Sequence, residues 1–571
     1  MRGATLLAEE PGLRTRAVAV VIDAFVAAAA AAGGAELSLS AAQPRRAFLC
    51  VARSDLDVGA GTDEEAVAAA ALATWRNYSA FYNNNGSVLL RASHEAAWAA
   101  LWESGIELAG NVTLAAAANA SLYDLLSSVR EGWPFSTSPG SLATNGYAGH
   151  TFWDSETWHA PPLQVLFPAI TRNLIKYRLA RLNASVARAT ALGFEGAAWP
   201  WESACTGLDA SGDRRNDLFE QHISADVALS TRRLYYAAAA ADPLLADSFA
   251  LINATAAFWV CRFVRADEPG GHNTSSCSPK GGGGTANYTI RGVVPPDEHG
   301  ARYGLVDDNP YTNAAAAATV AWAIEAAAAL SLPAPPPLWA AIAAAPFLPL
   351  NASLFAAGPV HNEFSSYWGE TVNQADVALL QWPLGLELEA GLAQRDLDFW
   401  ASRTNFSYMY TGDAAYSVAY LALGLRAAAD AQLGLAFAHI DAKSFFVFSE
   451  LAQQQGCLHF ITGAGGLLQT LVFGYPGLRL PRRGVLAFAS QQPVLPPMGV
   501  SAVRLRGLRL AGAALDVDYD AAAACVTLRG GGAALELRWG AGFANATRLA
   551  PAAPACLPLQ AFEVVALDTA V

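Results

Sequence analysis

Charge is scarce in this sequence, and lysine is almost missing from it. Only 15% of the 571 residues are charged, and the lysines are limited to Lys176, Lys280 and Lys443. The formal net charge is −13 and the isoelectric point is about 5.2, with no run rich in lysine and arginine. Such a surface repels phosphate backbones, so the composition argues against nucleic-acid binding and suits a neutral substrate.

Long apolar segments are also lacking, and the sequence predicts no membrane span. The longest apolar candidate, 314–332, contains Glu325 and is mostly alanine, which is a weak partner for lipid. Alanine runs such as 314–318 fit a coding bias better than functional low complexity. The first residues, MRGATLLAEEPG, do not resemble a signal peptide, because Glu9 and Glu10 stand where an apolar region belongs.

The cysteines are few, and none of their spacings resembles a metal site. Cys261 and Cys277 flank a segment rich in glycine and serine, and Cys525 and Cys556 lie near the end of the chain. Two disulfides are therefore plausible from the sequence, and free buried thiols are an equally good interpretation. We expect no metal and no cofactor.

Glycosylation sequons are abundant. Since about one residue in nine is serine or threonine, random placement would give roughly two Asn-x-Ser/Thr sequons. The sequence instead carries them at Asn77, Asn85, Asn111, Asn119, Asn183, Asn253, Asn273, Asn287, Asn351, Asn405 and Asn545. This enrichment predicts a route through the secretory pathway, to an extracellular, vacuolar or lysosomal destination.

The periodicity of apolar residues changes along the chain. From Ser93 to about Pro476, segments with apolar residues at intervals of three and four predict helices, separated by loops rich in Gly, Pro, Trp and Asp. After Pro476 the period is two, as in strands. We therefore expect a mainly α protein with a partial N-terminal β-rich domain (1–92), a linker helix (93–110), a helical catalytic domain (111–476) and a C-terminal β-sandwich (477–571).

Several of the predicted loops combine large aromatic rings with carboxylates. They are GHTFWDSETW (149–158), AWPWES (198–203), GVVPPDEHG (292–300), EFSSYWGETVNQAD (363–376) and FVFSE (446–450). A pyranose offers an apolar ring face to an indole and a belt of hydroxyls to a carboxylate, so this combination favours a sugar pocket. Each loop alone is explained at least as well by a helix start, by core aromatics or, for Glu450, by a solvated loop acid.

Taken together and in order, these loops resemble the catalytic domain of glycoside hydrolase family 65. DNPYTN (308–313) and FITGAGGLLQ (460–469) strengthen the resemblance, which covers roughly residues 93–530. It implies an (α/α)6 barrel between β domains, and inverting cleavage of an α-glucosidic bond. The motifs are most similar to those of members that release glucose from glucosyl-α-1,2-galactosyl-hydroxylysine.

The resemblance also implies roles for individual residues. Glu298 would be the general acid and Glu450 the general base, and no Ser–His–Asp arrangement competes with this pair. The substrate glucose would be held by Trp153, Asp154, Trp201, Glu202 and Gln374.

Three other functions stay open at this stage. A trehalase acts by the same chemistry on another disaccharide, and a disaccharide phosphorylase replaces the base by a serine-rich phosphate loop. The corresponding stretch here, YMYTGDAAYS (408–417), has no His-Gly-Ser-Ser pattern, which favours hydrolysis. A silent carbohydrate-binding protein would keep the fold and lack the base.

Overall fold

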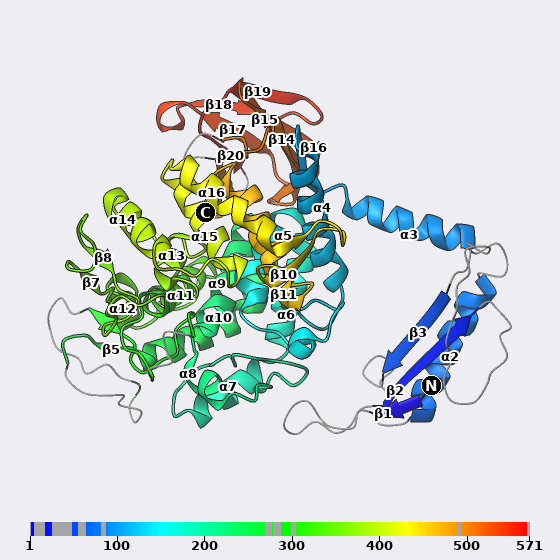
Figure 1. Ribbon diagram of the computed structural model, residues 1–571, viewed down its shortest axis with the longest axis horizontal. Coiled ribbons are helices and arrows are strands. Elements are labelled where there is room, and N and C mark those ends of the chain that lie inside the picture. Colours follow the sequence, from blue (N-terminus) through cyan, green and yellow to red (C-terminus); the bar gives the residue numbers. More distant parts are fainter. Residues whose placement is uncertain are drawn as a thin grey trace. The chain divides into compact units, whose positions relative to one another are not determined.

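Figure 1 shows the computed structural model, in which two compact units are distinguished, Met1–Glu103 and Ser104–Val571. The structure describes residues 2–4, 17–24, 48–54, 64–81, 87–268, 277, 287–298, 304–488 and 493–567.

The first unit contains a small antiparallel sheet and two helices. The strands β1 (Arg2–Ala4), β2 (Ala17–Ala24) and β3 (Phe48–Ser54) lie in the order β1-β2-β3. Helix α2 (Glu64–Phe81) packs against β2 and β3, and α3 (Ser87–Leu101) follows it. The predicted linker helix over 93–110 needs correction, because it is helical only as far as Leu101.

The second unit is mostly helical up to residue 469 and mostly strand beyond 478. Its helices are α4 (Val112–Ser128), α5 (Ala160–Leu166), α6 (Pro168–Leu179), α7 (Leu182–Ala191), α8 (Arg214–Phe219), α9 (Ile223–Ala237), α10 (Leu244–Arg262), α11 (Pro310–Ala329), α12 (Pro337–Ala344), α13 (Asp376–Gln381), α14 (Ala390–Ala401), α15 (Tyr410–Ala422), α16 (Arg426–His439) and α17 (Ile461–Gln469). Short strand pairs lie between them, namely β5 (Val264–Arg265) with β6 (Tyr288–Thr289), β7 (Leu350–Asn351) with β8 (Val360–His361), and β9 (Ile440–Asp441) and β11 (Gln455–Leu458) on either side of β10 (Val447–Leu451).

Six of these helices form a closed ring of neighbours. Helix α5 contacts α9, α9 contacts α11, α11 contacts α13, α13 contacts α15, α15 contacts α17, and α17 returns to α5. The remaining long helices pack on the ring: α4 on α17, α6 on α5, α10 on α9 and α11, α12 on α11, α14 on α13, and α16 on α15. Each ring helix thus has an outer companion.

Alanine allows the ring helices to approach closely. On α11, Ala315, Ala316 and Ala323 are completely buried against α9, α10 and α13. The indole N–H of Trp322 donates to Thr231 Oγ1 of α9 at 2.9 Å, which satisfies the one polar atom of that buried ring. The alanine run that suggested coding bias in the sequence therefore has a packing role in the fold.

The C-terminal strands form two five-stranded antiparallel sheets. One has the order β12-β13-β20-β17-β18 and the other β19-β16-β15-β14-β4. Burial alternates along β14, as expected for strands with one face in the core. Their bounds are β4 (Gly105–Ala109), β12 (Leu478–Arg479), β13 (Val485–Phe488), β14 (Ala502–Leu510), β15 (Ala513–Asp520), β16 (Ala523–Gly530), β17 (Leu535–Trp539), β18 (Asn545–Arg548), β19 (Pro554–Pro558) and β20 (Phe562–Ala566).

The edge strand β4 comes from the segment that the sequence analysis assigned to a linker helix. Ile106 and Leu108 are buried. Ala109 pairs with Ala502 of β14, so the start and the end of this unit's sequence meet in one sheet. The strand therefore ties the start of the second unit to its C-terminal sheet.

Both predicted disulfides are confirmed. Cys261 is bonded to Cys277, and Cys525 to Cys556 across the β16–β19 pair. Most of the glycine-rich segment between Cys261 and Asn287 lies outside the described residues.

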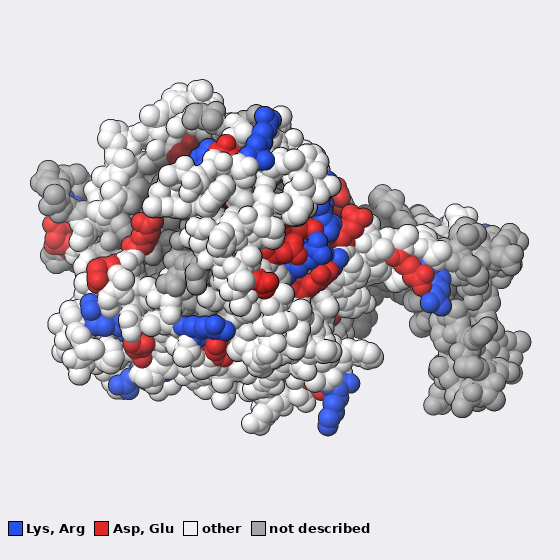
Figure 2. Space-filling model, turned by 90° about the horizontal axis from the view of Figure 1, so that it is seen from above, with Lys and Arg blue, Asp and Glu red and all other residues white. Residues whose placement is uncertain are grey.

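One described helix, α10, is long and apolar enough to cross a membrane by length and composition. Its most apolar window is 61% buried inside the protein, as for a helix of a protein core, so the prediction of no membrane span is not in conflict with it. Figure 2 shows one face of the molecule, on which charged side chains are sparse and both signs are mixed.

The close packing of the ring gives a test on one helix. Ala316→Leu places a branched side chain where α11 has no free volume, and should lower the free energy of unfolding by about 1–3 kcal/mol. The matched control is Ala321→Leu on the exposed side of α11, which should change it by less than about 0.5 kcal/mol. Thermal and urea unfolding measure both, and equal losses would show that α11 is not packed as described.

Candidate active site

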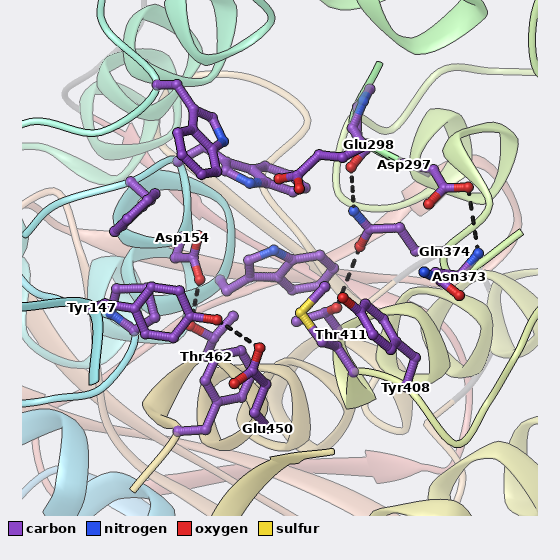
Figure 3. Close-up of a pocket in the computed structure, with 18 residues that line it drawn as sticks. Tyr147, Asp154, Asp297, Glu298, Asn373, Gln374, Tyr408, Thr411, Glu450 and Thr462 are labelled. Carbon is purple, nitrogen blue, oxygen red and sulfur yellow. Dashed lines mark hydrogen bonds between the residues drawn. The ribbon is translucent and has the colours of Figure 1, made fainter. Parts of the chain in front are cut away.

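A cavity of about 190 Å³ lies among the loops that lead into the ring helices (Figure 3). Its walls combine aromatic rings, four carboxylates and two amides. The lining residues are Pro139, Tyr147, Phe152, Trp153, Asp154, Trp158, Trp201, Pro296, Asp297, Glu298, Asn373, Gln374, Tyr408, Met409, Thr411, Glu450, Phe460 and Thr462.

The lining residues are linked to the ring by chain order. Trp158 precedes α5 by two residues, Gln374 precedes α13, Met409 precedes α15, and Phe460 precedes α17. The segments before α9 and α11 supply Trp201, Pro296, Asp297 and Glu298. The cavity is therefore built at the N-terminal ends of the ring helices, where backbone N–H groups and the helix dipole favour negative side chains.

Six of the seven predicted site residues line this one cavity, and the seventh does not. The six are Trp153, Asp154, Trp201, Glu298, Gln374 and Glu450. Glu202 is not among the lining residues; its Oε1 lies 2.7 Å from His150 Nδ1. This contact links the loop that holds Trp201 to the segment before α5, and the predicted role of Glu202 in binding glucose stays a prediction.

Asp154 is held by a chain of hydrogen bonds. Its Oδ1 accepts from Thr462 Oγ1 at 2.6 Å, and Thr462 Oγ1 lies 3.0 Å from His159 Nε2. His159 Nδ1 lies 2.8 Å from Thr137 Oγ1. Burial lowers the pKa of His159 to about 3, so the ring is neutral. Because the Thr462 proton points to Asp154, His159 must donate from Nε2 and accept at Nδ1.

Asp154 is almost completely buried, and burial is the main reason why its pKa is raised to about 6. The Thr462 hydrogen bond acts in the opposite direction and favours the ionised form. At neutral pH the carboxylate is therefore charged and oriented by Thr462.

Glu298 lines the cavity and is exposed to solvent, although neighbouring protein atoms partly desolvate its carboxyl. This desolvation, followed by the negative charges of Asp297 and Asp154, raises the pKa of Glu298 to about 7. Arg215, whose Nη2 donates to the Glu298 carbonyl at 3.3 Å, acts in the opposite sense. Glu298 is therefore a carboxyl that can carry a proton near neutral pH.

Hydrogen bonds from α13 and the residues before it hold the loop that carries Glu298. Gln374 Nε2 donates to the Pro296 carbonyl at 2.6 Å, and Asp376 Oδ1 accepts from the Asp297 N–H at 2.8 Å. Glu363 Oε1 accepts from the Asp376 N–H at 2.8 Å. Burial raises the pKa values of Asp376 and Glu363 well above their usual range, so this supporting cluster can hold protons.

Glu450 projects from β10 on the other side of the cavity from Glu298, as Figure 3 shows. Its Oε1 accepts from Tyr147 Oη at 2.7 Å, and its Oε2 accepts from the Cys457 N–H at 2.8 Å. Two acids in different environments thus face one cavity.

The aromatic wall is packed rather than free. Phe152 meets Trp201 edge-on with ring centroids 5.2 Å apart, and Trp153 meets the buried His222 ring in the same way at 4.8 Å. His222 Nδ1 lies 2.8 Å from Asp226 Oδ2, which holds the imidazole ring in place. These contacts fix the orientations of Trp153 and Trp201 in the structure without a ligand.

Several lining residues were missed by the sequence analysis, above all Tyr147, Tyr408 and Thr411. Tyr147 lies in NGYAGH, a stretch with no periodicity and no acid, so no signal in the sequence marks it. Tyr408 and Thr411 fall in the stretch examined for a phosphate loop. Among the described residues, no group of three or more His, Cys, Asp or Glu could hold a metal ion.

Comparison with known proteins now identifies the helical part of the chain. Residues 120–345 match the glycosyl hydrolase family 65 central catalytic domain. This part of the chain is therefore similar to a family 65 catalytic domain. Relatives include a protein-glucosylgalactosylhydroxylysine glucosidase of Dictyostelium discoideum, 33% identical over 438 residues, and a kojibiose hydrolase of Mucilaginibacter mallensis, 34% identical over 404 residues.

These alignments are partial for the relatives. They cover 75% of this chain and 57% of the Dictyostelium protein, and 70% of this chain and 56% of the Mucilaginibacter protein. The chain thus spans little more than half the length of these relatives. A periplasmic or secreted acid trehalase of Candida glabrata is 26% identical over 476 residues, covering 77% of this chain and 37% of the trehalase.

A solved structure shares the fold. A human-microbiome protein assigned as a kojibiose phosphorylase superposes with a TM-score of 0.71 at 15% identity, over 95% of this chain and 74% of that one. The mainly helical architecture with accompanying sheets is therefore shared with this solved structure.

Proposed function

We propose that this protein is an inverting glycoside hydrolase that releases glucose from an α-glucoside. The observation that carries the proposal is the pair of acids on opposite sides of one aromatic-walled cavity, with the pKa of Glu298 raised to about 7. The family 65 domain and relatives named as glucosidases and hydrolases support the same reaction class.

In this mechanism Glu298 is the general acid and Glu450 the general base. Glu450 removes a proton from water, whose oxygen bonds to C1 of the glucose from the face opposite the leaving group. As the bond between C1 and the glycosidic oxygen breaks, Glu298 gives its proton to that oxygen. An inverting enzyme requires about 6.5–9.5 Å between the two carboxyls to leave room for the water.

The remaining residues bind the glucose. The ionised Asp154, aimed by Thr462, accepts hydrogen bonds from sugar hydroxyls, and Trp153 and Trp201 cover the apolar ring faces. Gln374 Oε1 faces Thr411 at a long 3.5 Å, so it is available to a sugar hydroxyl as well. The ligand we infer is a single terminal glucose unit.

The substrate we favour is glucosyl-α-1,2-galactosyl-hydroxylysine or a related α-1,2-linked disaccharide unit. The names of the relatives support this choice, since one group acts on the hydroxylysine-linked glycan and another on kojibiose. Trehalose is the second candidate, because an acid trehalase is among the relatives.

We also infer that the helical region is an (α/α)6 barrel, roughly over 111–476, followed by a β-sandwich. The closed ring of six helices, each with an outer companion, supports the barrel, and the two five-stranded sheets support the sandwich. With β4 included, the sandwich would contain a strand from before the barrel.

We propose that the protein is a glycoprotein of the secretory pathway, with an extracellular, vacuolar or lysosomal destination. Of the sequon asparagines whose exposure the structure describes, none is buried. The printed name of the Candida relative, periplasmic or secreted, points the same way.

The first test is the anomer that the protein releases. In proton NMR of glucosyl-α-1,2-galactose in phosphate-free buffer, the wild type should produce β-glucose first. Glu298→Gln and Glu450→Gln should each lower kcat by about 10²–10⁴-fold, as expected on removing a general acid or base. Turnover only after addition of phosphate would establish a phosphorylase instead. Sugar binding without any turnover would establish a silent binding protein.

The second test is the basic limb of the pH profile. Glu298 must be protonated to act, so kcat/KM should fall as pH rises through about 7. Arg215→Gln removes a positive charge that lowers the pKa of Glu298, so the limb should move to higher pH. Asp213→Asn removes a negative charge that raises it, so the limb should move to lower pH.

Both shifts should be smaller than about one pH unit, because burial and the charges of Asp297 and Asp154 contribute more to the raised pKa of Glu298 than Asp213 or Arg215 do. Asn at 213 can still accept the hydrogen bonds that Asp213 takes from the first turn of α8, which keeps the helix start intact. Shifts of the same sign in the two variants would mean that another group sets the limb.

A further inference from the structure

We propose that Tyr147 is a positioning residue for Glu450: its hydroxyl, together with the Cys457 N–H, fixes the carboxylate that activates water. This inference rests on the proposed role of Glu450 as base. Its starting point is that the two oxygens of Glu450 have separate donors, Tyr147 Oη to Oε1 at 2.7 Å and Cys457 N to Oε2 at 2.8 Å.

The two donors come from segments that are packed closely together. Glu450 lies on β10 and Cys457 on the neighbouring β11, while Tyr147 lies about 300 positions earlier, in the loop before α5. Thr144 Oγ1 lies 3.5 Å from Cys457 Sγ, which ties that loop to the β10–β11 hairpin.

Gly146 is required for this approach. A Cβ at residue 146 would lie 2.2 Å from Cys457 Sγ and 3.2 Å from Cys457 Cβ. Only a residue without a side chain lets the loop come this near to the hairpin, and the next residue in the chain is Tyr147.

The tyrosine ring is held in place before any ligand arrives. Its centroid lies 5.4 Å from that of Phe152, edge-on, and 6.2 Å from that of Phe460. Tyr147 and Ala148 both have left-handed backbone conformations, with φ of 59° and 51°. Such residues each cost of order 1–3 kcal/mol and persist only where the surroundings impose them.

The phenol acts as a donor over the whole working range of pH. Burial, followed by the negative charge of Glu450, raises the pKa of Tyr147 above its usual value. The proton therefore stays on the phenol, and the hydrogen bond runs from Tyr147 to Glu450. With each oxygen of Glu450 accepting one bond, rotation of the carboxylate is restricted, and free lone pairs stay available for water.

The decisive variant is Tyr147→Phe, which keeps the ring and removes the hydroxyl. A misplacement of a reacting group by about 1 Å can cost about 10²-fold, so we expect kcat to fall by about 10–100-fold, with KM changed less than kcat. The matched control is Tyr236→Phe, which removes a tyrosine–glutamate contact to Glu325 outside the cavity and should leave kcat unchanged.

The substrate α-glucosyl fluoride separates an effect on the base from an effect on the acid. Fluoride leaves without protonation, so its hydrolysis needs the base and not the acid. We expect Tyr147→Phe to lose the same factor on the fluoride as on the disaccharide, as Glu450→Gln should, while Glu298→Gln keeps its activity on the fluoride. A loss confined to the disaccharide, or no loss on either, overturns the role of Tyr147.

A second variant disturbs the hydrogen bond between Tyr147 and Glu450 without changing either residue. Gly146→Ala should push the loop from the hairpin and lower kcat on both substrates, and Cys457→Ala in the same chain should restore part of the loss by removing Sγ. Absence of any loss in Gly146→Ala would also count against the proposal. If Glu450→Gln itself keeps full activity on both substrates, the proposed function fails, and that result is distinct from a failure of Tyr147 alone.

Discussion

The structure depends on the close packing of six helices in one closed ring. Small side chains on α11 let it lie against four other helices, α9, α10, α12 and α13, and the ring then closes from α17 back to α5. A closed ring brings the beginnings of its helices together, although Asp154 and Thr462 are separated by most of the domain. The cavity is thus a consequence of helix packing, and its residues are supplied by loops that the ring holds in place.

The same arrangement makes a cluster of acids tolerable. Asp154, Asp297, Glu298 and Glu450 all line one cavity, and no lysine or arginine is among its described lining residues. Burial raises the pKa values of Asp154 and Glu298 to about 6 and 7, although Arg215 acts in the opposite direction on Glu298. Helix N-termini and directed donors such as Thr462 offset part of the cost of the charges that remain. The outcome is that neighbouring carboxyls hold protons to different degrees, which acid–base catalysis needs.

Much of this could be predicted from the sequence, because the informative residues form compact local patterns. FWD, WPWE, PPDE and QAD each join unusual residue types within a few positions, and the two periods of apolar residues separate helices from strands. What failed were features that depend on distant partners. Strand β4 is defined by pairing with β14, and nothing in GIELA itself distinguishes an edge strand from the end of a helix. The contact of Glu202 with His150, 52 positions earlier, is likewise set by the fold and could not be predicted from the sequence. Tyr147 is joined to Glu450 only by the fold.

The charge of the cavity also bears on the choice between water and phosphate as the attacking group. A phosphate anion entering this space would meet Asp154 and Glu450, and the described lining offers no cation to compensate for its loss of hydration. Water carries no such penalty, and in the proposed mechanism Glu450 takes its proton. Tyr147 and the Cys457 N–H donate to the two oxygens of Glu450, which suits the role of base that we propose for it. The electrostatics of the site therefore favour hydrolysis over phosphorolysis, independently of the missing serine-rich loop.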